Sequence, residues 1–138
     1  AMKIGVIGSL QFVEQLFAAR DGLRNLGHDA FISSQAEPFL GKNQAERDAL
    51  NIQQKMEEDA IREFWRLMQG ADAVLAVNLE KRGIPGYIGG NTLLELGFAH
   101  VLGQKIFLWE PIPDIPYYQT EIEAMKPVII NGDLTLVR

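Results

Sequence analysis

The sequence predicts a single α/β domain, spanning residues 1–138, in which helices cover a mainly parallel β-sheet. Short apolar runs rich in β-branched residues alternate with amphipathic stretches of helical periodicity along the chain. Ala73–Asn78 is apolar almost throughout, which is typical of a strand covered on both faces. The length of 138 residues suits one domain, and no repeat or linker divides it.

Five short runs are expected to be strands, because each is apolar and is bounded by glycine, proline or polar residues. In chain order they are Lys3–Gly8, His28–Ser33, Ala73–Asn78, Lys105–Trp109 and Pro127–Ile130. The alternation of strands with helices favours a mainly parallel sheet. Five strands suit a flavodoxin-like or Rossmann-like three-layer sandwich.

Four helices are expected to connect these strands. Ser9 is a plausible N-cap for the first helix, which carries an apolar stripe over residues 13–26. Asn43 and Glu46 form an N-cap pair that opens a long helix, predicted to end near Gln69. The remaining two helices are predicted over residues 91–103 and 117–125.

The loop between the third strand and the third helix is the most informative segment. It contains four glycines, which let backbone N–H groups approach a ligand closely. The helix start adds unpaired N–H donors and a partial positive charge. In parallel sheets, ligands bind outside the carboxyl ends of the strands, where the strand order reverses. The expected cradle for a sugar or phosphate group consists of Gly8, Ser9, Gly89, Gly90, Asn91 and Thr92.

Two further side chains at this edge of the sheet are candidates for catalysis. Glu95 is predicted in the first turn of the third helix, among apolar residues. Its spacing from Thr92 also fits a capping box, in which the glutamate would bond only to the helix backbone. Asn78 ends the third strand, where it could orient Glu95 or a ligand, or simply bond the loop backbone.

Composition excludes several classes of function. The net charge of −5 argues against nucleic-acid polymers and anionic membranes as partners. Without cysteine, disulfides, thiol catalysis and cysteine-based zinc sites are excluded. No apolar run reaches bilayer length, and the start lacks a signal-peptide pattern, so the cytoplasm is the expected location. No metal site is expected, because His28 and His100 are isolated, and the glycine spacing fits neither a Walker loop nor a dinucleotide fingerprint.

Three segments together carry a resemblance to a known family: Lys3–Ser9, Gly70–Asn78 and Gly90–Ala99. Over nearly its whole length the chain resembles the nucleoside 2-deoxyribosyltransferases and the related 2′-deoxynucleoside 5′-monophosphate N-hydrolases. In that family the glutamate of a Thr-x-x-Glu-x-Gly-x-Ala pattern is the catalytic nucleophile. The resemblance implies this role for Glu95. Glu63 falls near an acidic position of the family and is a further, weaker candidate.

The family mechanism implies cleavage or transfer of an N-glycosidic bond. The carboxylate attacks the anomeric carbon of a (deoxy)ribose as the base leaves, and the glycosyl-enzyme then passes to another base or to water. The implied partner is a small-molecule nucleoside or nucleotide, and no cofactor is needed. A homo-oligomer is also implied, because family members often complete their active sites with residues of a neighbouring subunit.

The sequence departs from the family pattern at Gly89. The transferases commonly carry an aspartate there, and the monophosphate hydrolases a serine. The first strand also lacks the tyrosine of the transferases, for which Tyr87 could substitute. Gly89 favours an alternative function, a non-catalytic nucleotide-binding or sensing module on the same scaffold. A phosphoribohydrolase of the lysine-decarboxylase-like type is a second alternative, but its Pro-Gly-Gly-x-Gly-Thr loop is matched only at Pro85–Gly86.

Overall fold

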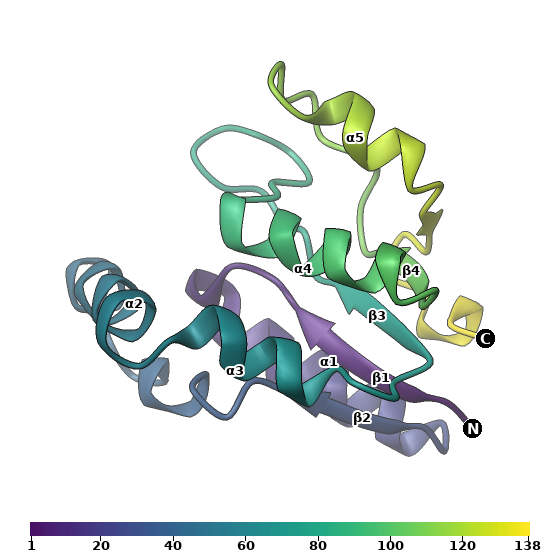
Figure 1. The fold of residues 1–138 in the computed structure, drawn as a ribbon, viewed down its shortest axis with the longest axis horizontal. Coiled ribbons are helices and arrows are strands. Elements are labelled where there is room, and N and C mark those ends of the chain that lie inside the picture. The colour runs from purple at the N-terminus through teal and green to yellow at the C-terminus, as the bar shows by residue number, and fades with distance from the viewer.

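The computed structural model describes residues 1–138 and contains one five-stranded sheet in which every neighbouring pair of strands is parallel (Figure 1). The strand order is β2-β1-β3-β4-β5, a flavodoxin-like order, so the predicted fold class is confirmed. The strands are β1 (Lys3–Ile7), β2 (Asp29–Ile32), β3 (Ala73–Ala76), β4 (Lys105–Leu108) and β5 (Val128–Ile129).

The strands are shorter than the apolar runs that predicted them. β3 ends at Ala76, although the apolar run continues to Asn78. The Val77 amide, just past β3, still donates to the Ile7 carbonyl at 2.8 Å, and this is the last backbone hydrogen bond between the two segments. At Gly8, which has a φ of 154°, the backbone after β1 turns away from the segment after β3. The pairing of these two strands therefore cannot continue.

Helices cover both faces of the sheet, which makes three layers (Figure 1). The α-helices are α1 (Val13–Asn25), α2 (Gln44–Glu57), α3 (Ala60–Leu67), α4 (Gly90–Val101) and α5 (Gln119–Ala124). Short 3₁₀ helices are η1 (Leu10–Phe12), η2 (Glu37–Phe39) and η3 (Leu134–Leu136). On one face, Leu16 and Leu23 of α1 pack on the sheet. On the other, Phe64 of α3, Leu96 of α4 and Ile122 of α5 form the second core. No helix combines the length and apolar character needed to cross a lipid bilayer.

The single long helix predicted to run to Gln69 is wrong, because the chain breaks into α2 and α3 at Glu58 and Asp59. Asp59 adopts a left-handed conformation with a φ of 48°, and its side chain accepts a hydrogen bond from the Arg62 amide. An aspartate tolerates this conformation better than most residues and is a favourable N-cap. The break lets α3 pack on the sheet while α2 stands apart from it (Figure 1).

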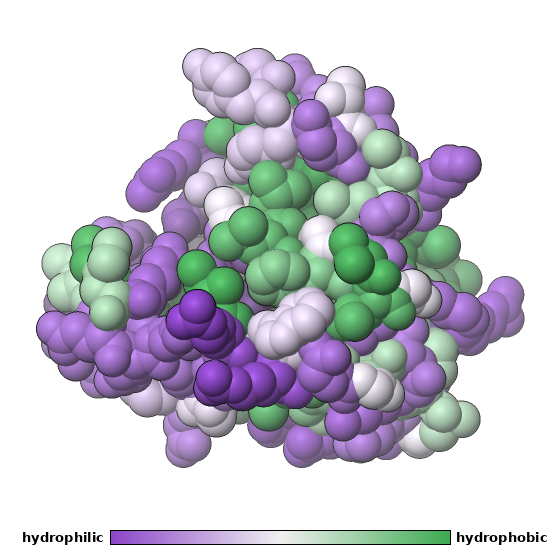
Figure 2. Space-filling view, in the orientation of Figure 1, coloured by the Kyte–Doolittle hydropathy of each residue, from purple (hydrophilic) through white to green (hydrophobic).

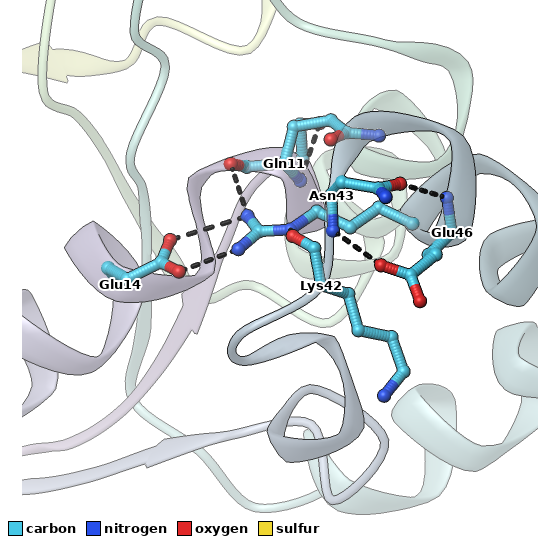
Figure 3. Close-up of polar contacts among 7 residues, drawn as sticks. Gln11, Glu14, Lys42, Asn43 and Glu46 are labelled. Atoms are coloured by element: carbon cyan, nitrogen blue, oxygen red, sulfur yellow. Dashed lines mark hydrogen bonds and ion pairs between the residues drawn. The ribbon is translucent and has the colours of Figure 1, made fainter.

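The start of α2 is fixed by the predicted cap and by a buried arginine (Figure 3). The Asn43 side chain accepts from the Glu46 amide, and the Glu46 side chain accepts from the Asn43 amide, each at 2.9 Å. Arg47 pairs with Glu14 of α1 at 2.6 Å and donates to the Gln11 carbonyl at 2.9 Å. These contacts tie α2 to η1 and to the start of α1, and so place the side chains that α2 contributes to the site.

Candidate functional site

A cleft opens at the carboxyl end of the sheet, where the strand order reverses between β1 and β3. It consists of an inner hollow beside β1 and β2, and an outer hollow beside the start of α4. The two hollows adjoin, because they share the lining residues Gly8, Leu10, Asn51, Lys55 and Asn91.

The six residues expected to form a cradle all line the outer hollow. They are Gly8, Ser9, Gly89, Gly90, Asn91 and Thr92. Gly8 and Ser9 follow β1, whereas the other four form the N-cap and first turn of α4, so residues about 80 positions apart meet at one edge of the sheet. No side chain caps α4, since its N-cap is Gly89. The first N–H groups of α4 therefore face the hollow without a side-chain acceptor.

Glu95 lies in the wall of the inner hollow. The helix begins at Gly90, so Glu95 is in its second turn, and the expectation of a first-turn position is corrected. Thr92 lies inside the helix rather than at its N-cap, and the alternative capping box does not form. Only 8% of Glu95 is exposed, and its carboxyl group has no hydrogen-bond partner in the protein. The carboxyl oxygens of this buried acid are therefore free to interact with a molecule in the cleft.

The surroundings of Glu95 disfavour its charged form. Burial, and to a smaller extent the nearby carboxylate of Glu63, raise the pKa of Glu95 to about 8, although the ammonium group of Lys55 acts in the opposite direction. With no ligand bound, most Glu95 side chains therefore carry a proton at neutral pH. A ligand that brings positive charge, or that opens the cleft to water, would favour ionisation.

Glu63, on α3, is held beside the cleft by two hydroxyl groups. Ser34 donates to one carboxylate oxygen at 2.6 Å, and Ser33 donates to the other at 3.2 Å. Ser33 itself lines the inner hollow, whereas Glu63 does not. Glu63 therefore acts on the site through its charge and through the orientation of Ser33.

Asn78 does not line either hollow, so the structure does not bring it together with the other candidates. Its side-chain amide donates to the carbonyls of Gly86 (3.2 Å) and Glu110 (3.0 Å), and its side-chain oxygen accepts from the Glu110 amide at 2.9 Å. Asn78 is buried and tied to loop backbone, which corrects its expected role as an orienter of Glu95. It instead holds the loops after β3 and β4 together.

Several lining residues were missed from the sequence. From α2 come Asn51, Gln54 and Lys55, and from the loop before α4 come Lys81 and Tyr87. The α2 residues were missed because that segment was predicted to be part of one continuous helix. Asp59 followed by Arg62 was a signal for the break that brings α2 over the cleft.

The inner hollow combines apolar walls with a few amide and hydroxyl groups. The apolar side chains are Val6, Ile7, Leu10, Leu16, Ile32, Ala60 and Phe64. Gln54 donates to the Gln35 carbonyl at 2.9 Å, while the side-chain oxygen of Gln35 is buried without a donor. Such a buried acceptor is unusual unless a ligand or water supplies the missing hydrogen bond. No group of three metal-ligating His, Cys, Asp or Glu side chains is present.

Comparisons with protein-family models, with curated proteins and with solved structures found no match to this chain. The fold class is therefore defined by the sheet order and the layers alone: a flavodoxin-like α/β protein with a cleft at the switch point. The similarity to nucleoside 2-deoxyribosyltransferases stays a prediction from motifs.

Proposed function

We propose that this protein binds a nucleoside or nucleotide and cleaves or transfers its N-glycosidic bond, with Glu95 as the nucleophile. One observation carries the proposal: the carboxyl group of Glu95 is buried, has no partner in the protein, and lines a cleft beside the glycine-rich start of α4. A buried acid with a raised pKa in a cleft is a common property of catalytic groups.

The cleft also suits the two ends of such a ligand. The inner hollow offers apolar walls and amide groups, which match the flat faces and polar edges of a nucleobase. The outer hollow offers backbone N–H groups and the Ser9 hydroxyl, which match a sugar or phosphate. Glu95 lies beside the inner hollow, one helical turn beyond the residues of the outer one, where the bond between base and sugar would fall.

The proposed reaction has two steps. The ionised Glu95 oxygen forms a bond to the anomeric carbon, while the bond from that carbon to the base nitrogen breaks and its electron pair leaves with the base. The base takes a proton from water or from a donor in the cleft. Water, or the nitrogen of a second base, then attacks the same carbon while the bond from that carbon to the Glu95 oxygen breaks. The attacking group gives up one proton to solvent, and the Glu95 carboxylate is free again. Neither a metal ion nor an organic cofactor is required.

The alternative is a non-catalytic nucleotide-binding or sensing module. Gly89 favours this function, since position 89 has no side chain that could deliver a proton to the leaving base. The same cleft would then bind the ligand without turnover, and the raised pKa of Glu95 would serve to keep a neutral hydrogen-bond donor in the site.

The decisive experiment incubates the protein with deoxynucleosides, ribonucleosides and their 5′-monophosphates, with and without an acceptor base, and measures free base by chromatography. We expect base release by the wild-type protein, and its loss in both Glu95→Ala and Glu95→Gln. Glu57→Gln, an exposed glutamate of α2, is the matched control and should retain activity. Circular dichroism checks that each variant is folded.

Two results would contradict the proposed enzymatic activity. Base release that persists in Glu95→Gln would show that Glu95 is not the nucleophile. Ligand binding without any base release across the whole panel would support the sensing module instead.

A further inference from the structure

A separate hollow of about 500 Å³ lies at the amino ends of β4 and β5, at the other end of the sheet from the candidate cleft. Its apolar walls come from Ile106, Phe107, Met125, Val128 and Leu136. Val128 is 49% exposed and Leu136 is 37% exposed, so the rest of the chain does not cover these two side chains. A hollow of this volume is in the size range of small-molecule sites.

A notch in the edge of the sheet borders this hollow. β5 pairs with β4 only from Phe107 onward. Lys105 and Ile106, at the start of β4, therefore pair with β3 on one side and with no strand on the other. Lys126, two residues before β5, has a left-handed φ of 54° and does not continue the line of the strand. The backbone of β4 is thus left uncovered at its start.

The notch leaves one backbone donor of β4 without an acceptor. The amides of Lys105 and Trp109 donate to carbonyls on the β3 side, at 3.0 and 2.9 Å. The Leu108 carbonyl accepts from the Ile130 amide on the β5 side. Because backbone groups alternate between the two sides of a strand, the Ile106 N–H group points toward the β5 side. It has no acceptor there, since β5 has not yet begun.

The same hollow concentrates positive charge. Lys105, Lys126 and Arg138 line it, and no carboxylate does. None of the three takes part in an ion pair of the protein, and the Lys105 ammonium group donates only to the Arg138 carbonyl, at 3.3 Å. In a chain with a net charge of −5, this cluster is a local region of positive potential.

Gln104, in the wall of the hollow, has an unsatisfied polar atom. Only 8% of this residue is exposed. Its side-chain amide donates to the Met68 carbonyl at 2.7 Å, whereas its side-chain oxygen is buried without a donor. A buried acceptor is normally satisfied by a protein group, an ordered water or a ligand. The hollow therefore combines apolar walls, positive charge and polar groups that the protein leaves unpaired.

We propose that this hollow is a binding site for an amphiphile, namely an anionic oxygen head group joined to an apolar body. The head group accepts hydrogen bonds from the Ile106 N–H group and from the ammonium groups of Lys105 and Lys126. The apolar body covers Val128 and Leu136. The hollow shares no lining residue with the candidate cleft, so this site does not depend on the proposed function.

Both parts of the amphiphile are needed to match the hollow. A free inorganic anion would leave the apolar walls exposed to water. A neutral apolar molecule would leave the Ile106 N–H group and the positive charges without a partner. A cationic amphiphile would be repelled by the three cationic side chains.

The test compares probes that share a head group or a tail. Isothermal titration is carried out with octanoate, octyl phosphate, octan-1-ol, octylamine and acetate. We expect octanoate or octyl phosphate to bind at least about tenfold more tightly than the other three, as one charge-assisted hydrogen bond would provide. The tighter of the two identifies the head group. In nitrogen-15 NMR spectra, the Ile106 N–H resonance should move downfield when this probe binds.

Variants separate the head-group contacts from the apolar contacts. Lys126→Glu should weaken binding of the anionic probe at least about tenfold, because it replaces an attractive charge by a repulsive one. Leu136→Gln should weaken octanoate binding and leave acetate binding unchanged. Lys42→Glu makes the same charge change at an exposed position outside the hollow, and should behave as wild type. Circular dichroism checks that each variant is folded.

The proposal is overturned if octan-1-ol or octylamine binds as tightly as the anionic probes, or if acetate binds as tightly as octanoate. It is also overturned if Lys126→Glu and Lys42→Glu have equal effects, or if the Ile106 resonance does not respond. A wild type that binds no probe but loses self-association in Lys126→Glu, measured by light scattering, would make the hollow a contact between copies instead. Each of these outcomes is independent of base release and of Glu95.

Discussion

At the scale of single residues, the environment of Glu95 differs from that of every other carboxyl group whose pKa is shifted. Burial and the charge of Glu63 raise the pKa of Glu95 to about 8, whereas hydrogen bonds lower the pKa values of Glu14, Asp59 and Asp133. The three lowered groups are stabilised by specific donors. Glu95 has none, which is the arrangement expected where a side chain is kept for a ligand rather than for the fold.

This difference predicts how stability depends on pH. Glu95 has a pKa of about 8 in the folded protein against an ordinary value of 4.5, so the folded state binds more protons between these two pH values. The free energy of unfolding should therefore fall as pH rises through this window, by up to about 1.4 kcal/mol per pH unit. Glu95→Gln should remove this decrease in the free energy of unfolding. Urea denaturation of the wild type and of Glu95→Gln at about pH 5.5 and about pH 8.5 measures the free energy of unfolding.

Glu57→Gln, at an exposed position, is the control and should keep the pH dependence of the wild type. If Glu95→Gln and the wild type lose stability equally between the two pH values, Glu95 is not the buried titrating group. Asp59 and Asp133 do not affect this comparison. Their pKa values are lowered in the folded protein, so the stability that each carboxylate contributes is lost only as the pH falls toward those values.

At the scale of elements, the break between α2 and α3 decides which residues reach the cleft. α3 packs on the sheet through Phe64, whereas α2 packs through Leu50 on a small cluster around Phe39 and carries Asn51 and Lys55 to the cleft. One straight helix could not do both, because its two halves need different directions. Asp59 makes the change of direction, with its left-handed backbone and its N-cap bond.

Asp59→Ala should therefore destabilise the protein by about 1–2 kcal/mol, since alanine loses the cap and disfavours a positive φ. Asp59→Asn should cost less, because asparagine caps helices and tolerates this backbone conformation. Urea denaturation at neutral pH compares the two variants. Equal stability of Asp59→Ala and wild type would mean that the break does not depend on this residue.

At the scale of the whole molecule, an apolar surface over α4 bears on the state of assembly. Figure 2 shows apolar side chains gathered over this helix. Leu94 is 46% exposed and Val101 is 82% exposed, while Leu96 and Ala99 of the same helix are buried against the sheet. A helix that is apolar on both sides is usually covered on both sides. The homo-oligomer that the family resemblance implies would cover this surface.

The protein should therefore be larger than a 15.4 kDa monomer by size-exclusion chromatography with light scattering. Val101→Glu should shift it toward the monomer, because a charge would be buried in the contact. His100→Glu, at the neighbouring exposed position, changes charge outside the apolar stripe and should leave the assembly intact. A monomeric wild type would contradict the homo-oligomer that the family resemblance implies.

The sequence by itself determined the class of fold, because apolar β-branched runs alternating with helical stretches leave few arrangements other than a parallel sheet between helices. It also predicted that the loop after the first strand and the glycines at the start of α4 would meet, because both lie where parallel strands end. The ends of the elements were not determined in the same way, because the apolar run continues to Asn78 whereas β3 ends at Ala76.

Only the tertiary structure decided the direction of each side chain. It turned Asn78 into the loops, left Glu95 without a partner, and broke the predicted long helix so that Lys55 faces the cleft. It also brought Tyr87 beside Gly89 through a turn at Arg82 and Gly83. Periodicity reports which residues are apolar, but the partner of a polar side chain depends on contacts between distant segments, and those exist only once the chain is folded.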